Sequence, residues 1–290
     1  MDLSKPRSPL SQGGYESYYL KAHAPERDRA VWLRATNLQA PKGSARGQLW
    51  TTLFSPEGVR QDRRDGMLQI FENGLGTEDG FLRTVGARAS ADGLEWEVTW
   101  EPLAEELPYL PPIAYRGALP KTKPVSLAPR ARFSGSVTLA GETLDMDGWE
   151  GMVGHNWGSS HAERWIWMHG LFGDGEWIDL VAARVRIAGV LLPWAVTGGA
   201  YLGGRSHRFR QLSNKHVTVA GDRIAIDVPS RSLRIDGMLI GGRTATWDYE
   251  HPSGGHSLVR NCSLSRLEVL AGNQRHLTTA AALELGAPGD

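Results

Sequence analysis

Several features that would narrow the function are scarce in this sequence of 290 residues. It holds one cysteine, Cys262, so no internal disulfide can form and no oxidising compartment is implied. Neither charge is in excess, because 32 Lys and Arg residues balance 32 Asp and Glu residues. Domains that bind nucleic-acid phosphates or anionic lipid headgroups carry surplus basic side chains. The sequence therefore predicts no nucleic-acid partner.

Long apolar runs are missing as well. The basic residues of Met1–Arg7 are not followed by the continuous apolar region of a secretory signal. No stretch approaches the 18 apolar residues that a membrane-spanning helix needs. We expect a cytoplasmic protein with no integral membrane segment, and the sequence leaves its oligomeric state open.

Tryptophan, by contrast, is abundant: there are eleven, against seven tyrosines and six phenylalanines. An indole buries a wide flat surface and still needs a partner for its N–H group. Together with the balanced charge, this composition predicts an uncharged, hydrophobic ligand.

Apolar residues recur with a period of two, as half-buried strands require. The clearest run is Leu94–Trp100, in which four apolar side chains alternate with polar ones. Similar runs lie near residues 133–139, 224–228, 233–235 and 277–285, and Gly-rich turn signals separate them. This pattern indicates an all-β protein made of antiparallel sandwiches or barrels.

Prolines divide the chain near its middle. Residues 108–130 hold six prolines, which argues against a central strand there and predicts an extended crossover. The interpretation that follows is two β-barrels, covering residues 14–130 and 131–286. A single large sandwich is the competing architecture.

Candidate chemistry concentrates in residues 149–170, where four tryptophans and three histidines lie within 22 positions. On one strand Trp165, Trp167 and His169 share a face, because side chains repeat every second residue. The histidines at 155, 161 and 169 fit no compact metal-ligand spacing. We therefore expect no metal.

An acid, Asp179, interrupts the apolar stripe of the strand that follows. A two-residue turn at 174–175 would place Leu180 opposite His169, whereas a three-residue turn at 173–175 would place Asp179 there, on the tryptophan face. The three-residue turn is favoured. It puts an acid and an imidazole within mutual reach among indole rings.

Such a pair would suit acid/base chemistry on an apolar substrate, because burial among aromatic groups raises the pKa of a carboxyl group. The candidate catalytic residues are His155, Asp179 and His169. The candidate substrate-binding residues are Trp149, Glu150, Trp157, Trp165, Trp167 and Trp177. Alternatives stay open: Asp179 can face solvent or pair with Arg164 or Arg184, His155 can be a buried imidazole bonded to backbone, and Trp157 and Trp165 can be plain core.

The motif Gly154–Gly158, which reads Gly-His-Asn-Trp-Gly, followed by Arg164–Trp167, resembles the AttH-like and carotenoid 1,2-hydratase (hydroxyneurosporene synthase) group of lipocalin-like proteins. Tocopherol cyclases and some fungal Diels–Alderases are similar to this group. Residues 256–264 also resemble it, and the likeness extends from about Tyr15 to Gly286. The resemblance implies two consecutive lipocalin-like β-barrels and a cavity for a hydrophobic molecule, without metal or organic cofactor.

The hydratase branch of that group protonates an isolated double bond and lets water capture the cation. Its His-x-Trp motif matches His155 and Trp157 here. Its Tyr-x-Asp motif has no plain counterpart, since the nearest acid is Asp179, and Trp177 stands where the tyrosine would be.

The leading hypothesis is a cofactor-independent enzyme, a hydratase-type lyase, a cyclase or an isomerase, acting on a polyene, terpenoid or polyketide-like substrate. The indole faces would stabilise a developing carbocation. The alternatives are a carrier that binds the same kind of ligand unchanged, and an interaction module whose second barrel is filled by side chains.

Overall fold

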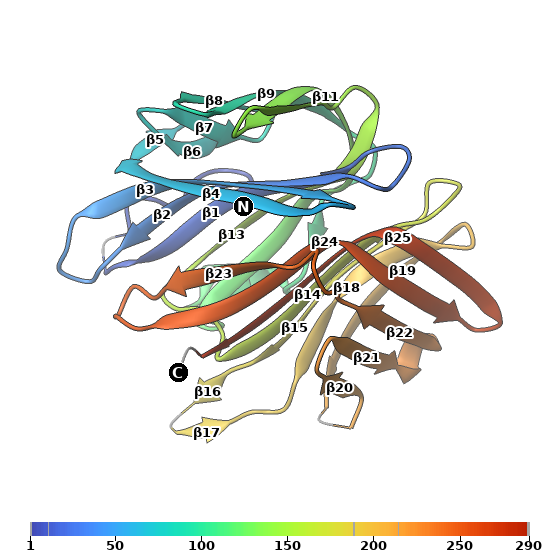
Figure 1. The fold of residues 1–290 in the computed structure, drawn as a ribbon. Helices are drawn as coiled ribbons and strands as arrows, with labels where there is room; N and C mark the ends of the chain where they lie inside the picture. Colours follow the sequence, from blue (N-terminus) through green and yellow to red (C-terminus); the bar gives the residue numbers. More distant parts are fainter. Residues whose placement is uncertain (1, 11, 188, 214, 289–290) are drawn as a thin grey trace. The chain divides into compact units, whose positions relative to one another are not determined.

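The computed structural model describes residues 2–10, 12–187, 189–213 and 215–288. Almost all regular structure in these residues is antiparallel strand (Figure 1). The helical elements of the described residues are α1 (Pro112–Arg116) and the short 3-10 turn η1 (Pro229–Arg231). None of these helices is long and apolar enough to cross a membrane. The predicted all-β class is confirmed.

The first sheet of the described chain has thirteen strands and forms a nearly closed antiparallel barrel. Its order is β4-β3-β2-β1-β13-β11-β9-β8-β7-β6-β5, and β10 and β12 pair with β11 beside this path. Strand β6, next to one end of this order, also packs against β2 and β1 near its other end. The strands are β1 (Gly14–His23), β2 (Ala30–Gln39), β3 (Ala45–Ser55), β4 (Gly58–Met67), β5 (Gln69–Phe71), β6 (Gly74–Thr77), β7 (Gly80–Arg83), β8 (Gly86–Ala91), β9 (Leu94–Pro102), β10 (Leu107–Pro108), β11 (Thr122–Leu139), β12 (Glu142–Asp145) and β13 (Trp149–Gly158).

The core of this barrel follows from side-chain alternation. In β9, Leu94, Trp96 and Val98 are buried while the residues between them are exposed, as the period of two predicts. The indole N–H of Trp96 donates to the hydroxyl of Thr51 at 3.0 Å, so this buried polar group is satisfied. Trp96 is therefore a core residue of the first barrel.

The prediction that residues 108–130 hold no central strand is wrong for the last nine of them. Strand β11 begins at Thr122 and lies between β13 and β9, although it contains Pro124 and Pro129. Its pairing with β9 starts only at Ala131, and its pairing with β13 shifts register between Ala128 and Ala131. The shift accommodates Pro129, which has no N–H group to contribute to a ladder.

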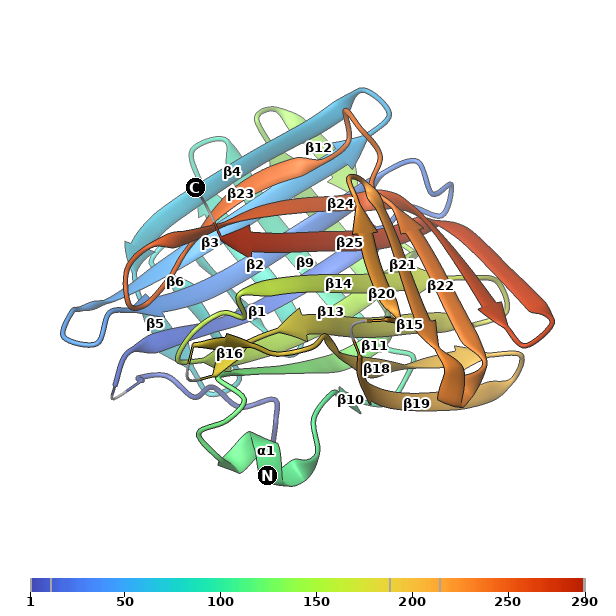
Figure 2. The ribbon, with the colours of Figure 1, turned by 90° about the horizontal axis from the view of Figure 1, so that it is seen from below.

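The second sheet of the described chain has ten strands in the order β19-β18-β15-β14-β25-β24-β22-β21-β20, with β23 beside β24. Figure 2 shows β14, β15, β18 and β19 side by side in this order. The strands are β14 (Arg164–Leu171), β15 (Trp177–Arg184), β18 (Ala195–Leu202), β19 (Arg205–Leu212), β20 (Val217–Ala220), β21 (Arg223–Val228), β22 (Leu233–Met238), β23 (Ala245–Glu250), β24 (His256–Ala271) and β25 (Gln274–Pro288). Strands β16 (Arg186–Ile187) and β17 (Val190–Leu191) pair with each other.

The turn between β14 and β15 has three residues, as predicted. Phe172 N donates to Glu176 O at 3.0 Å and closes the loop, and Gly175 adopts φ +81°, in the left-handed region that suits glycine. The resulting register places His169 directly opposite Asp179.

By contacts the chain divides into two compact units. The first comprises residues 1–54, 59–161 and 250–256, and the second comprises residues 55–58, 162–249 and 257–290. The expected domain boundary at residues 130/131 falls inside β11, which belongs to the first unit along its whole length. The proposed division into domains 14–130 and 131–286 stays a prediction.

Candidate functional site

The first candidate cluster lies on the interior face of the first barrel. Odd-numbered residues of β13 point inward, and they include His155 and Trp157. Tyr18 of β1 pairs with His155 across the ladder, and their rings stack with centroids 4.1 Å apart. The indole of Trp157 also stacks with the imidazole of His155, and the two ring centroids are 4.7 Å apart. His155 therefore sits among aromatic rings.

A carboxylate that the sequence analysis missed completes this cluster. Glu16 lies two residues before Tyr18 on β1, so both side chains share the interior face. Its Oε1 is 2.8 Å from Nε2 of His155, and both side chains are fully buried. The other ring nitrogen, Nδ1, lies 2.8 Å from the backbone oxygen of Leu3.

These partners fix where the protons lie. A backbone carbonyl only accepts, so Nδ1 of His155 carries a proton that it donates to Leu3 O. Glu16 also accepts hydrogen bonds from the Arg7 N–H, the Ser8 N–H and the Ser8 hydroxyl, at 2.6, 2.6 and 2.5 Å. A carboxylate with this many donors is ionised, and an ionised Glu16 requires a second proton on His155 at Nε2. The pair is an imidazolium against a carboxylate.

The pKa of Glu16 reflects this balance. Burial pushes the pKa upward, but the hydrogen bond and charge of His155, with the hydrogen bonds from Ser8 and Arg7, outweigh it and lower the pKa below its ordinary value. The neighbouring Tyr18 has its pKa raised, chiefly by burial and then by the negative charge of Glu16. The cluster therefore favours the ionised form of Glu16.

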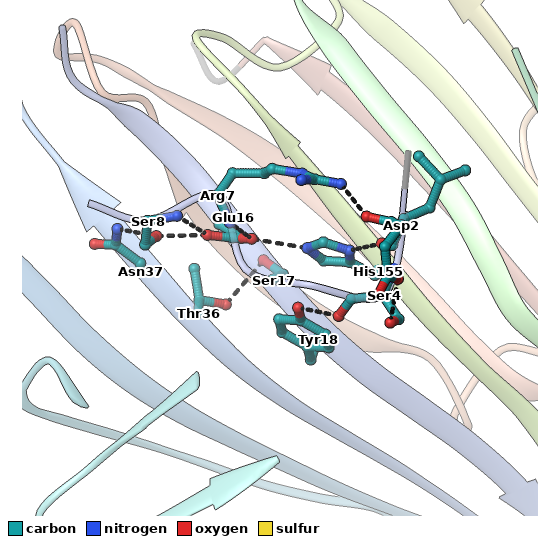
Figure 3. A network of polar contacts seen from close by, with 11 residues as sticks. Asp2, Ser4, Arg7, Ser8, Glu16, Ser17, Tyr18, Thr36, Asn37 and His155 are labelled. Carbon is teal, nitrogen blue, oxygen red and sulfur yellow. Dashed lines mark hydrogen bonds and ion pairs between the residues drawn. The ribbon is translucent and has the colours of Figure 1, made fainter. Parts of the chain in front are cut away.

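Apart from His155, the donors to Glu16 belong to the segment of residues 2–10, which we call the N-terminal strap. Figure 3 shows this strap lying along Glu16, Tyr18 and His155. Besides the bonds to Glu16 and His155, Ser4 O accepts from the hydroxyl of Tyr18 at 2.7 Å. Asn37 Nδ2 donates to the Ser8 hydroxyl at 2.7 Å. The ion pair thus anchors the strap to the first barrel.

Two other predicted residues of the first unit have different surroundings. Trp149 is buried in the main core cluster of the first barrel. Glu150 points to the other face of β13, where its carboxylate accepts from Arg130 Nη2 at 2.7 Å. Neither contacts the ion pair by any hydrogen bond in the described residues.

The second candidate cluster lies on one face of β14 and β15. His169 and Asp179 are directly opposite each other, and both are fully buried. The indole N–H of Trp167 donates to Oδ1 of Asp179 at 3.0 Å. The rings of Trp167 and His169 lie nearly parallel, with centroids 6.4 Å apart. We call Trp165, Trp167, His169, Trp177 and Asp179 the tryptophan stripe.

The rest of the stripe is anchored by a second carboxylate. Trp165 Nε1 donates to Oε1 of Glu284 at 2.8 Å, and Glu284 Oε2 accepts from Asn261 Nδ2 at 3.0 Å and from the Tyr249 hydroxyl at 3.3 Å. Trp165 is half-buried, and its ring stacks with that of Tyr249, with centroids 6.1 Å apart. Plain core does not describe it.

The alternatives left open by the sequence can now be compared with the structure. Asp179 is buried and bonded to Trp167, and Arg184 directs its Nε to Leu192 O instead. His155 does bond to backbone, through Leu3 O, but its second bond is to Glu16. The structure brings His169 to Asp179 within the second unit, whereas His155 belongs to the first unit.

Glu16 carried a signal that could have identified it. It stands on the face shared by Tyr18, Leu20 and Ala22, so it interrupts an apolar stripe in the way that Asp179 does. The strap carried no such signal. Among the described residues, no three His, Cys, Asp or Glu side chains converge as a metal site would require.

Comparisons with known proteins add the following. No family model matches the chain. Two curated relatives from Mycobacterium tuberculosis, uncharacterized proteins MT0513 (strain CDC 1551 / Oshkosh) and Rv0493c (strain ATCC 25618 / H37Rv), are each 29% identical over 185 residues. That alignment covers 61% of this chain and 55% of theirs, so the chain spans about half the length of the curated relatives it matches.

Among solved structures, the fold is similar to an AttH-like protein from Nitrosomonas europaea and to kievitone hydratase from Nectria haematococca. The first has a TM-score of 0.63 and 12% identity, over 97% of this chain and 96% of that one. The second has a TM-score of 0.63 and 10% identity, over 99% of this chain and 91% of that one. At these identities the likeness establishes a shared fold.

Proposed function

We propose that this protein binds a hydrophobic small molecule of the polyene, terpenoid or polyketide kind against the tryptophan stripe and promotes its hydration, cyclisation or isomerisation by acid/base chemistry. Asp179 is the proton donor and His169 its partner. Trp165, Trp167 and Trp177 provide the apolar surface for the substrate. No cofactor takes part in this scheme.

One observation carries the proposal: a fully buried carboxyl group is held by an indole N–H and faces an imidazole on the neighbouring strand. The bond from Trp167 to Oδ1 orients the carboxyl group, and in this proposal the transferable proton is the one on Asp179. Removal from water is the usual way in which proteins make a carboxyl group a proton donor near neutral pH. The arrangement therefore supports proton transfer to an apolar substrate.

The chemistry begins with transfer of this proton to a carbon–carbon double bond. The cation that forms is then captured by water, by an internal double bond, or by loss of another proton, which gives hydration, cyclisation or isomerisation respectively. Indole faces attract a neighbouring cation by about 1–2 kcal/mol each when water is excluded. His169 can accept the proton that leaves in the second half of each reaction.

His155 was a second candidate partner for Asp179. Its two ring nitrogens already bond Glu16 and Leu3 O, so its protons are engaged by the protein itself. We assign His155 and Glu16 the role of anchoring the strap, with Trp157 as part of that anchor. Of the two solved neighbours, one is named a hydratase, which fits the proposed reaction class through a shared fold only.

Carriage of the ligand without conversion is the alternative function. The observation that favours it is the first-barrel ion pair, whose hydrogen-bonding groups are used by protein atoms and not offered to a ligand. A carrier would need the aromatic surface and not the acid. Substitution of Asp179 therefore distinguishes the enzyme from the carrier.

The test compares Asp179→Asn with the matched control Asp236→Asn, which alters a partly exposed carboxylate paired with Arg234 in the same unit. Each variant is titrated with a panel of polyenes and isoprenoids by tryptophan fluorescence, and each is assayed for conversion by mass spectrometry. The enzyme proposal predicts that Asp179→Asn retains saturable quenching and loses conversion at least 100-fold. Conversion at the wild-type rate would contradict it, and binding without conversion by the wild type would favour the carrier.

A further inference from the structure

A second histidine–carboxylate pair lies in the second unit, away from the tryptophan stripe. Nδ1 of His276 is 2.7 Å from Oε2 of Glu176. The two side chains are 10% and 16% exposed. Glu176 immediately precedes β15, and His276 is near the start of β25. The function proposed above uses neither residue.

The pair lies on the opposite face of β15 from Asp179. Side chains alternate along the strand, so Glu176 shares its face with Ile178 and Leu180, which are fully buried. His276 likewise shares its face with Thr278 and lies opposite the buried Val269 of β24. The pair therefore lies on one side of the second sheet and Asp179 on the other, and the neighbouring side chains are buried on both sides.

Three turns surround the pair. The 173–175 turn leads directly into Glu176, and Gly203 of the β18–β19 turn donates its N–H to Glu176 Oε1 at 2.7 Å. A Cβ on Gly203 would meet Oε1 of Gln274, which places the β24–β25 turn at the same end of the sheet. Phe172 adds an aromatic edge, with its ring centroid 5.8 Å from that of His276.

The hydrogen bonds determine what His276 offers to a ligand. An ionised carboxylate only accepts, so the proton of a neutral His276 lies on Nδ1 and points to Glu176. Nε2 is then a lone-pair acceptor. In the described part of the chain Nε2 is buried and has no hydrogen-bond partner. A buried acceptor of this kind is costly to leave unpaired, so the arrangement favours a donor from outside the chain.

We propose that Glu176 and His276 form a recognition site for a hydroxyl-bearing hydrophobic small molecule, whose O–H group donates to Nε2 of His276. The single acceptor matches a single hydroxyl, as in an alcohol or a phenol. Phe172, whose ring meets the imidazole edge-on, gives the site an apolar side. Gly203 and Glu176 hold the imidazole in the tautomer that accepts. The role is binding, and no bond to the ligand is made or broken.

The test uses 1-naphthol, which carries an O–H donor, and 1-methoxynaphthalene, in which a methyl group replaces that hydrogen, and it measures the affinity of each by calorimetry. Wild-type protein is expected to bind 1-naphthol at least tenfold more tightly, the ratio that one uncompensated hydrogen bond produces. His276→Phe is expected to bring the ratio close to one. His216→Phe, a histidine substitution elsewhere in the second unit, is expected to keep it.

A second measurement locates the contact and covers the case in which His276→Phe fails to fold. In wild-type protein labelled with 15N-histidine, 1-naphthol is expected to shift the Nε2 resonance of His276, and 1-methoxynaphthalene is not. Glu176→Gln, which weakens the hold on the tautomer, is expected to lower the affinity ratio several-fold. The proposal would be overturned by equal affinities for the two probes or by an affinity ratio that survives His276→Phe. It would also be overturned if the Nε2 resonance showed a hydrogen bond to an ordered water and did not change when 1-naphthol was added.

Discussion

His155 Nε2 and Glu16 Oε1 lie 2.8 Å apart, and together they join strands whose residues are 139 positions apart in the sequence. Both side chains are fully buried, and each is hydrogen-bonded to the strap as well as to the other. A buried ion pair does not by itself stabilise a fold, because desolvation offsets the attraction. Removal of one partner of the pair is nevertheless costly, because the other charge is left buried without its countercharge. The predictions for the first barrel depend on this asymmetry.

Replacement of Glu16 by glutamine leaves the His155 imidazolium without its countercharge in the barrel interior. We expect the free energy of unfolding to fall by about 3 kcal/mol. Urea denaturation at pH 7 measures the change. Glu97→Gln, at an exposed position beside Arg88, is the control and is expected to change stability by less than about 0.5 kcal/mol. Equal effects of the two substitutions would contradict the ion pair.

The lowered pKa of Glu16 predicts how stability depends on pH. An unfolded glutamate titrates near pH 4.3, and the folded value is lower, so the unfolded chain takes up the proton first. The stabilisation by Glu16 is therefore complete above about pH 4.3 and is lost as the pH falls through the folded-state pKa. Unfolding free energies between pH 7 and pH 3 should decline less steeply in Glu16→Gln than in the wild type. Parallel curves would show that Glu16 does not contribute.

The strap should loosen when one of its anchors is removed. The Ser8 hydroxyl donates to Glu16 and accepts from Asn37, so Ser8→Ala should cost about 1–2 kcal/mol. Hydrogen exchange at Arg7 and Ser8, whose N–H groups donate to Glu16, should become faster. Ser90→Ala, at an exposed position, should leave both readouts unchanged. Unaltered exchange in Ser8→Ala would contradict the anchoring role.

The bond between Trp167 and Asp179 should matter for stability independently of any catalysis. Trp167→Phe keeps an aromatic ring but removes the N–H group that Asp179 Oδ1 accepts. We expect a loss of about 1–3 kcal/mol in unfolding free energy, because a buried acceptor loses a donor. Trp100→Phe, which removes a similar donor to the half-buried Thr84 O, provides the comparison and should cost less. A smaller effect at Trp167 than at Trp100 would argue against a dry, ordered stripe.

The sequence predicted those parts of the fold that depend on local pattern. Alternation in Leu94–Trp100 identified β9, and glycine in a left-handed position at 175 identified the three-residue turn and hence the register of His169 with Asp179. Period two and turn chemistry act over a few residues, so they can be read without knowing the tertiary contacts.

The parts that could not be predicted depend on residues far apart in the chain. Glu16 and His155 are joined only because β1 pairs with β13, and no local pattern specifies that pairing. The strap is held largely by the backbone N–H groups of residues 7 and 8 and the backbone carbonyl of residue 3. These groups are present whatever the side chains are, so the sequence does not reveal them. Pro129 within β11 was misjudged because a register shift, invisible in the sequence, accommodates it.

The most direct test of the proposed chemistry is a reaction in deuterium oxide. Protonation of a double bond by an exchangeable acid places one deuterium on carbon, whether water, an internal double bond or proton loss completes the reaction. Wild-type protein incubated in deuterium oxide with the polyene and isoprenoid panel should yield a product with one carbon-bound deuterium, detected by mass spectrometry. Asp179→Asn should bind the same compound and form at least 100-fold less of that product. Labelled product formed at the wild-type rate by Asp179→Asn would contradict the assignment of Asp179 as the acid.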